Sequence, residues 1–467
     1  MFIKQKEWKE KIVKKTAIIL LWLVIWQVVA TVVGNKVLFA SPLETLKAFF
    51  MLCMEADFLR ILLASSLKLS LGFVLGLLAG AILGCLGAKK KWVNDVLKPL
   101  LAFMKSVPVA AFVVMLLVWW GSKWLSVAIV FVVVFPHIYM AFYEGLRQVD
   151  KQMVEVAKVF GMHSFNKVCY LYRGALKPFL ENGLKLSLGL SWKSGVAAEV
   201  IGTPDYSIGE ALYMAKTHLN TSEVFAWIAV ILMLSSLFEK VGLYLFHRFC
   251  NFKPKCKAPK AKSTEMENGE ASDLSTVISK TYDGRVIWDG LALNMEKGKI
   301  YTLQAPSGRG KTTLFRILAG LEENESGFDS EKANSNIKKV SAKNCSMLFQ
   351  EDRLLLQETP LTNIELCIGS QEREEIKRQL TELIPELLEE QTCAQLSGGM
   401  KRRVCLVRAM MADSDLVLLD EPFAGLDEDT KKLAIDYILK MQRSRTIVVV
   451  THQENDAKML NSTHFNM

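Results

Sequence analysis

Ala305-Pro-Ser-Gly-Arg-Gly-Lys-Thr-Thr313 lies between an apolar run typical of a buried strand and an apolar run typical of a helix. Glycines at such a junction let backbone N–H groups converge on phosphate oxygens, and the helix N-terminus adds positive potential. Within the loop, Lys311 is placed to reach the outer phosphates and Thr312 to bind Mg²⁺. The pattern is that of a Walker A loop and predicts a nucleoside-triphosphate site that also includes Ser307, Gly308, Gly310 and Thr313.

Two adjacent carboxylates, Asp420 and Glu421, end a later apolar run that begins at Leu416. Asp420 suits a Mg²⁺ ligand, and Glu421 suits a base that orients water. Such a pair alone is more often an ordinary strand end. Its position downstream of the phosphate loop favours a hydrolytic site.

Residues 274–467 read as a soluble α/β domain, because short strand-like runs alternate with helical stretches. The strand-like runs are Leu274 to Ile278, Arg285 to Trp288, Ile300 to Gln304, Cys345 to Phe349, Leu416 to Leu419 and Thr446 to Val450. Residues 251–273 are rich in Lys, Pro, Ser, Glu and Gly, a composition that predicts a flexible linker.

Residues 1–250 are dominated by apolar stretches of spanning length, and the chain as a whole is 51% hydrophobic. We expect an all-α transmembrane domain of six helices ahead of the α/β domain. The predicted crossings are Thr16 to Val33, Ile61 to Leu86, Leu100 to Trp120, Leu125 to Phe142, Gly183 to Ile201 and Val224 to Phe246.

Basic residues gather at the ends of these stretches, notably at the N-terminus, in Lys89-Lys90-Lys91 and in the loop after the fourth crossing. Cytoplasmic loops hold the positive excess, so both termini and the α/β domain are predicted to be cytoplasmic. The formal charge of +9 is therefore assigned to an anionic lipid surface and not to nucleic acid. Nine cysteines without a CxxC pair indicate neither a disulfide scaffold nor a zinc site.

Gly72, Gly76, Gly80 and Gly84 recur at every fourth position of the second predicted crossing. Small residues at this spacing form one helix face and let two helix backbones approach closely in lipid. We therefore expect close packing of this helix against another.

Leu396-Ser-Gly-Gly-Met400 resembles the signature sequence of ABC-type ATPases, and other elements of that family follow in the family's order. The resemblance implies that Ser397, Gly398 and Gly399 contact ATP held by a second copy of the domain. Because the chain has one copy of each motif, we predict that it forms a homodimer. The resemblance also implies that Tyr282 stacks on adenine and that Gln350 binds the metal and couples it to the membrane domain. It further implies that Ala424 to Asp427 is the D-loop and that His452 contacts the terminal phosphate.

The loop at about 144–178 resembles the cytoplasmic EAA loop of bacterial ABC importers. Glu155 and Gly161 match its glutamate and glycine, which implies that they couple the ATPase to the permease. Val156 and Gly174 depart from the family pattern, where alanine and proline are usual, whereas Pro178 is retained.

The stretch Gly183 to Gly202 resembles permeases of the nitrate, sulfonate and taurine importer class. Lys193 and Glu199 lie within it, and ionisable groups inside an apolar crossing mark pathways. We hypothesise that Lys193 faces the pathway and favours an anionic cargo. The alternative is a lysine that extends to the membrane interface.

The resemblance implies an ATP- and Mg²⁺-dependent importer of the bacterial inner membrane that takes a small anion from an extracytoplasmic binding protein. An exporter and a membrane-anchored signalling ATPase are the alternatives, and a vitamin-precursor pyrimidine is an alternative cargo. The sequence leaves open whether each ATPase domain docks beneath its own permease or its partner's.

Overall fold

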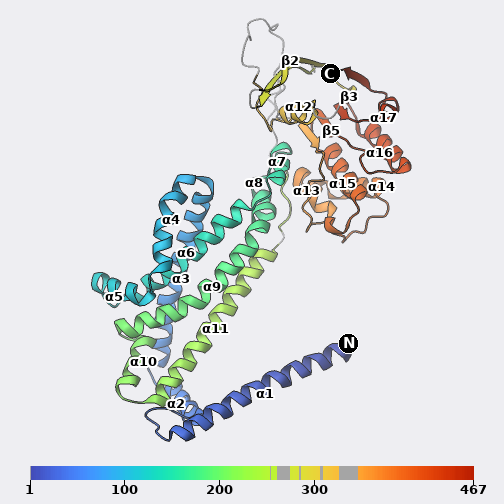
Figure 1. The fold of residues 1–467 in the computed structure, drawn as a ribbon. Helices are drawn as coiled ribbons and strands as arrows, with labels where there is room; N and C mark the ends of the chain where they lie inside the picture. Colours follow the sequence, from blue (N-terminus) through green and yellow to red (C-terminus); the bar gives the residue numbers. More distant parts are fainter. Residues whose placement is uncertain are drawn as a thin grey trace. The chain divides into compact units, whose positions relative to one another are not determined.

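A computed structural model describes residues 2–252, 254–259, 274–282, 285–304, 309–325 and 345–466. The chain divides into two compact units (Figure 1). The first holds residues 1–148 and 175–252, and the second holds residues 149–174 and 253–467. Residues 149–174, here called the coupling segment, therefore belong to the same unit as the α/β domain. Ser307, Gly308 and most of the predicted linker lie outside the described residues.

The first unit is helical throughout its described elements. These are α1 (Phe2–Val33), α2 (Pro42–Met54), α3 (Phe58–Lys89), α4 (Lys91–Ser106), α5 (Val109–Trp120), α6 (Leu125–Arg147), α9 (Arg173–Gly202), α10 (Ile208–Thr217) and α11 (Thr221–Asn251). Within the described part of the chain, four helices are long and apolar enough to cross a membrane, or five if the bent pair of α4 and α5 counts as one span.

Two of the six predicted crossings differ from this result. The crossing predicted at Leu100 to Trp120 is not one continuous helix, because the chain bends by 105° between α4 and α5, beside Pro108. Helix α9 is long enough to span, but charged residues such as Lys185, Lys193 and Glu199 reduce its hydropathy, and it is not among the candidate spans. Its crossing stays a prediction.

The core of this unit is built on the close packing of α3 against α6, as the glycine stripe predicts. A Cβ atom added at Gly76 or Gly80 would lie 2.9 Å from the Cβ of Val134 or Ile138, closer than real side chains pack. Gly72 and Gly84 meet backbone atoms of α6 in the same way. The expectation of close helix packing is confirmed.

The second unit contains a parallel five-stranded sheet in the order β4-β5-β6-β3-β7, and a separate antiparallel hairpin of β1 and β2. Its strands are β1 (Leu274–Tyr282), β2 (Arg285–Met295), β3 (Ile300–Gln304), β4 (Cys345–Leu348), β5 (Leu416–Asp420), β6 (Thr446–Val450) and β7 (Thr463–Asn466). Its helices are α7 (Lys151–Val159), α8 (Ser164–Asn166), α12 (Lys311–Leu318), α13 (Pro360–Ile368), α14 (Arg373–Leu383), α15 (Gly398–Met411), α16 (Glu428–Met441) and α17 (Glu454–Met459), with a π-helical turn over Lys167–Tyr172. The parallel strands bring their carboxyl ends to one edge, where ligands bind in open α/β sheets.

The residues of β5 and β6 are buried throughout, which explains their unbroken apolar sequence. Part of the predicted linker also packs in this unit. Residues 254–259 contact the coupling segment and the helices of the α/β domain, and the Cys256 side chain is buried. The predicted flexible linker therefore includes residues that are packed. Residues 254–259 make contacts that the polar composition of 251–273 does not reveal.

Candidate functional site

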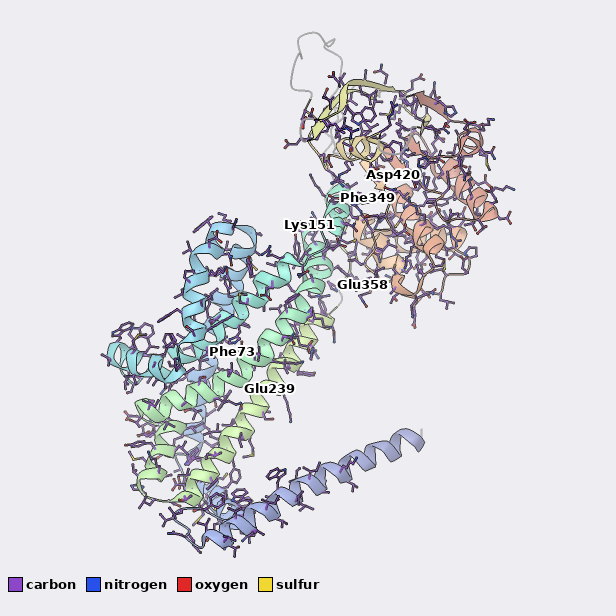
Figure 2. The ribbon with its side chains drawn as sticks, in the orientation of Figure 1. Phe73, Lys151, Glu239, Phe349, Glu358 and Asp420 are labelled. Carbon is purple, nitrogen blue, oxygen red and sulfur yellow. The ribbon has the colours of Figure 1, made fainter. Side chains whose placement is uncertain are left out.

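A cavity of about 330 Å³ lies where the predicted nucleotide-binding motifs meet. The cavity is lined by Ile287, Gly310, Lys311, Thr312, Thr313, Gln350, Asp420, Glu421 and His452. These residues come from the start of α12, from the ends of β4, β5 and β6, and from the hairpin strand β2. Figure 2 labels Asp420 at the end of β5 and Phe349 directly after β4.

The N-terminus of α12 opens onto this cavity. Gly310 caps it with a left-handed φ of +83°, and a Cβ at that position would lie 2.6 Å from Ile287. Lys311 begins the helix and is 8% exposed. A lysine beside the free N–H groups of a helix N-terminus forms a site for phosphate oxygens.

The oxygens of Thr312 and Asp420 meet in the cavity. The Thr312 hydroxyl donates to an Asp420 carboxylate oxygen over 3.4 Å. Burial, and then the charge of Glu421, raises the pKa of Asp420, while Arg402 and Lys311 act against this. The described residues contain no cluster of three or more His, Cys, Asp or Glu side chains that could hold a metal ion. The two oxygens nevertheless fit Mg²⁺, which binds through one or two protein ligands together with substrate phosphates.

Glu421 and His452 form the other wall of the cavity. The Nε2 atom of His452 lies 3.1 Å from Oε1 of Glu421. Glu421 has a left-handed φ of 50°, which is unusual for a residue with a side chain, and its N–H donates to the Val450 carbonyl over 3.0 Å. The backbone thus holds this carboxylate in a strained position at the cavity.

Arg402 of α15 binds the backbone of this strained region. Arg402 is not among the residues predicted from the sequence. Its guanidinium is 3% exposed and donates to the carbonyls of Phe349 (2.6 Å), Gln350 (3.1 Å) and Glu421 (2.8 Å), and also to the carbonyl of Asp420. It therefore joins the ends of β4 and β5. No short sequence motif could have indicated this, because its partners lie 18 or more residues away.

The signature residues do not line the cavity of their own chain. Ser397 caps α15 by accepting from the Met400 N–H over 3.3 Å, and both Ser397 and Gly398 are exposed. A Cβ added at Gly399 would lie 3.3 Å from the side chain of Leu426, in the predicted D-loop. Tyr282 is the last residue of β1, and its side chain is not among those that the structure describes.

The coupling segment contacts the α/β domain through Glu155. Its carboxylate accepts from Arg316 of α12 over 2.7 and 3.1 Å and from Arg353, after β4, over 2.6 Å. The hydrogen bond from Arg316 is the main cause that lowers the pKa of Glu155. Figure 2 marks Lys151, at the start of the same helix α7. The resemblance to the EAA loop predicts a coupling role for Glu155, whereas no sequence motif indicates either arginine.

Gly161 ends α7 in a Schellman motif. It has a φ of +60°, its N–H donates to Lys158, and the N–H of Met162 donates to Ala157. Only glycine adopts this conformation without cost, so Gly161 sets the direction in which the chain leaves α7.

The two predicted pathway residues lie in different surroundings on α9. Lys193 is exposed. Glu199 is fully buried, where its carboxylate accepts from the hydroxyl of Ser65 over 2.8 Å and from the N–H of Gly209 over 3.4 Å. Glu199 thus joins α3, α9 and the start of α10.

Taken together, a helical membrane unit and a P-loop nucleotide-binding unit define an ATP-driven membrane protein. Residues 288–424 match the family model for an ABC transporter, and residues 72–246 match that for a binding-protein-dependent transport system inner membrane component. The chain belongs to the ABC transporter family, and it carries an importer-type permease and the ATPase in one polypeptide.

Among curated relatives, the aliphatic sulfonates import ATP-binding protein of Rhodococcus jostii is 35% identical over 40% of this chain and 75% of its own length. The spermidine/putrescine import ATP-binding protein of Spiroplasma citri is 34% identical over 39% of this chain, and the chain covers 55% of that relative. For the sulfate/thiosulfate import ATP-binding protein of Agrobacterium fabrum, the identity is 32% and the coverage is 38% of this chain and 56% of the relative. The chain thus spans about half the length of some of these relatives. A dimeric bacterial ABC transporter cassette of known structure is 26% identical, with a TM-score of 0.34, over 40% of this chain and 91% of the cassette.

Proposed function

We propose that two copies of this chain form an importer of the bacterial cytoplasmic membrane, with both termini in the cytoplasm. In this proposal the cargo is a small anion such as a sulfonate, taurine or nitrate, delivered by an extracytoplasmic binding protein. The observation that carries the proposal is the ion-pair cluster of Glu155 with Arg316 and Arg353, because it joins the permease's coupling segment to the nucleotide-binding domain.

The cavity residues divide the work of hydrolysis. Lys311 and the N-terminus of α12 would bind the outer phosphates, while Thr312, Asp420 and Gln350 would hold Mg²⁺ together with the nucleotide. When bound, Mg²⁺ neutralises phosphate charge. Glu421 orients the attacking water and accepts its proton. His452, at 3.1 Å from Glu421, keeps that carboxylate directed toward the terminal phosphate.

A second copy completes each site. The cavity lacks the signature motif of its own chain, and Ser397 and Gly398 are exposed at the start of α15. This arrangement supports an ATP molecule held between the cavity of one copy and the signature residues of the other. Closure of the two domains on ATP is then the power stroke.

The coupling path begins at the phosphate site. Arg316 lies on α12, whose first residues line the cavity, and Arg353 follows Gln350 by three residues. A shift of either element therefore acts directly on Glu155. Because Gly161 sets the direction in which the chain leaves α7, the displacement passes to the rest of the coupling segment.

The anionic cargo rests on two lines of support. Sulfonate and sulfate importers are among the relatives, although the matched region is ATP-binding sequence and a polyamine importer also matches. Lys193 is exposed on α9, so in this proposal its positive charge is available to an anion on the pathway. Replacing Lys193 with Met should reduce uptake of the identified anion, and unchanged uptake would remove this residue from the pathway.

The test uses the full chain in liposomes, with ATPase measured for wild type, Glu421→Gln and Glu155→Gln. Candidate binding proteins are added with and without bound anion. We expect stimulation by one loaded partner, no hydrolysis in Glu421→Gln, and retained basal hydrolysis without stimulation in Glu155→Gln. ATPase activity indifferent to every binding protein would favour an exporter or a signalling ATPase.

A further inference from the structure

Residues 254–259, here called the strap, lie between the coupling segment and the helices of the α/β domain within the second unit. The strap begins three residues after α11 ends at Asn251. Composition assigned it to a linker, yet its backbone makes specific contacts on two sides.

On one side the strap binds the coupling segment. The side chain of Asn166, which is fully buried, donates to the Lys257 carbonyl over 2.8 Å and accepts from the Lys257 N–H over 3.0 Å. The Tyr170 hydroxyl donates to the Pro254 carbonyl over 2.7 Å. The Asn166 pair reproduces the two hydrogen bonds of a strand ladder, so it holds the strap's backbone in one register.

On the other side the strap binds the turn between α13 and α14. The Ser370 hydroxyl donates to the Cys256 carbonyl over 2.9 Å. A Cβ at Gly369 would lie 2.9 Å from Cα of Ala258, so the two backbones are in direct contact. The Cys256 side chain is buried in one apolar cluster with Met153 of the coupling segment and others of the α/β domain.

We propose that the strap is an intramolecular clamp that commits each ATPase domain to the coupling segment of its own chain. This deepens the proposed function and rests on it, because it takes the coupling segment as the transmitter. Three residues extend at most about 10 Å, so a domain held by the strap stays within that distance of the end of its own α11. A free linker of 23 residues would extend to about 75 Å and would permit docking beneath either permease.

Charge exchange between two chains tests which coupling segment is used. One chain carries Glu155→Arg, and the other carries Arg316→Glu with Arg353→Glu. If docking is within a chain, both contacts in a mixed dimer are mismatched, and stimulation of the ATPase by the loaded binding protein stays absent. Docking between chains would instead leave one contact native and one reversed, and co-expression would restore stimulation and overturn the proposal.

A single chain with all three exchanges is the positive control, since it restores the pairing in either arrangement. If Glu155→Arg alone leaves stimulation intact, the proposed coupling role of Glu155 fails. The clamp is then decided by the second experiment, which does not depend on transport.

The second experiment measures alkylation of Cys256 by iodoacetamide in the full-length protein, followed by mass spectrometry. Cys256 is 6% exposed, and burial raises its pKa to about 11, so the docked thiol should react far more slowly than in the unfolded protein. Asn166→Ala with Ser370→Ala removes three hydrogen bonds to the strap and should accelerate alkylation about tenfold or more. Stimulated ATPase activity should fall while basal activity stays.

Thr381→Ala is the matched control, because its hydroxyl donates to the Lys377 carbonyl within α14 and does not touch the strap. It should leave both alkylation and stimulation at the wild-type level. Equal alkylation rates in the wild type, the double variant and the unfolded protein would show that the strap is not docked.

Discussion

Replacing Arg402 tests whether the strained carboxylate at the cavity depends on a buried guanidinium. Arg402 donates to carbonyls at the ends of both β4 and β5 and lies 3.2 Å from the Asp352 carboxylate. A neutral, shorter side chain would leave the buried carbonyls of Phe349 and Asp420 without this donor, at about 1–3 kcal/mol each. Arg402→Met is therefore expected to destabilise the domain strongly, and Arg402→Lys is the informative change.

Lysine keeps the charge but has three donors on one atom, so it serves only part of the planar set of acceptors. Relaxation of Glu421 from its φ of 50° releases about 1–2 kcal/mol and moves its carboxylate. A displacement near 1 Å reduces catalysis about a hundredfold. We expect kcat for ATP to fall by about that factor while KM changes by less than about threefold, because Lys311 and Thr312 are untouched.

Arg445→Lys is the matched control. Arg445 is 9% exposed and donates to the carbonyls of Ala412, Met441 and Gln442, none of which lines the cavity. Steady-state ATPase assays and thermal denaturation are compared for both variants. For each variant, the loss of kcat is compared with the drop in its thermal midpoint. If Arg402→Lys loses no more kcat per degree than Arg445→Lys, Arg402 has no specific effect on the position of Glu421.

Three further predictions follow from packing, pH and coupling. Gly80→Ala should lower the free energy of unfolding by about 1–3 kcal/mol, and with it the thermal midpoint, because the new Cβ would lie 2.9 Å from the Cβ of Ile138. Gly174→Ala should leave the thermal midpoint unchanged, because a Cβ at Gly174 would meet no atom within 4 Å. The pKa of Glu155 is lowered from its usual 4.5, so the stability it adds over Glu155→Gln should persist above that pH. It should disappear only as the pH falls through the lowered pKa, which thermal midpoints of both proteins from pH 7 down to about pH 2 would show. Arg402→Lys and Glu155→Gln should be non-additive by about 0.5 kcal/mol or more in the kcat measured with the loaded binding protein present, and an additive double mutant would show that the two contacts act independently.

The strands and the cavity at their ends were predictable because buried parallel strands have unbroken apolar sequence and their carboxyl ends meet at one edge of the sheet. The runs at 300–304, 416–419 and 446–450 are β3, β5 and β6, and the acids and histidine that follow two of them line one cavity. The partners of Glu155 were not predictable, because Arg316 and Arg353 are 161 and 198 positions away. The strap was missed for another reason: its hydrogen bonds are made by its backbone N–H and carbonyl groups, which composition does not report.

The contacts of residues 349–353 link the cavity to the coupling segment. Arg402 holds the carbonyls of Phe349 and Gln350 and, through the same guanidinium, that of Glu421. Four residues after Phe349, Arg353 binds Glu155 of the coupling segment. Gln350, between them, lines the cavity. One end of this short segment is therefore held by the guanidinium that also binds the Glu421 carbonyl, and the other end contacts Glu155 of the coupling segment. Because the segment between these contacts is short, we expect a rearrangement of Glu421 to change the contact at Glu155, and the double-mutant comparison of Arg402→Lys with Glu155→Gln is the measurement that decides it.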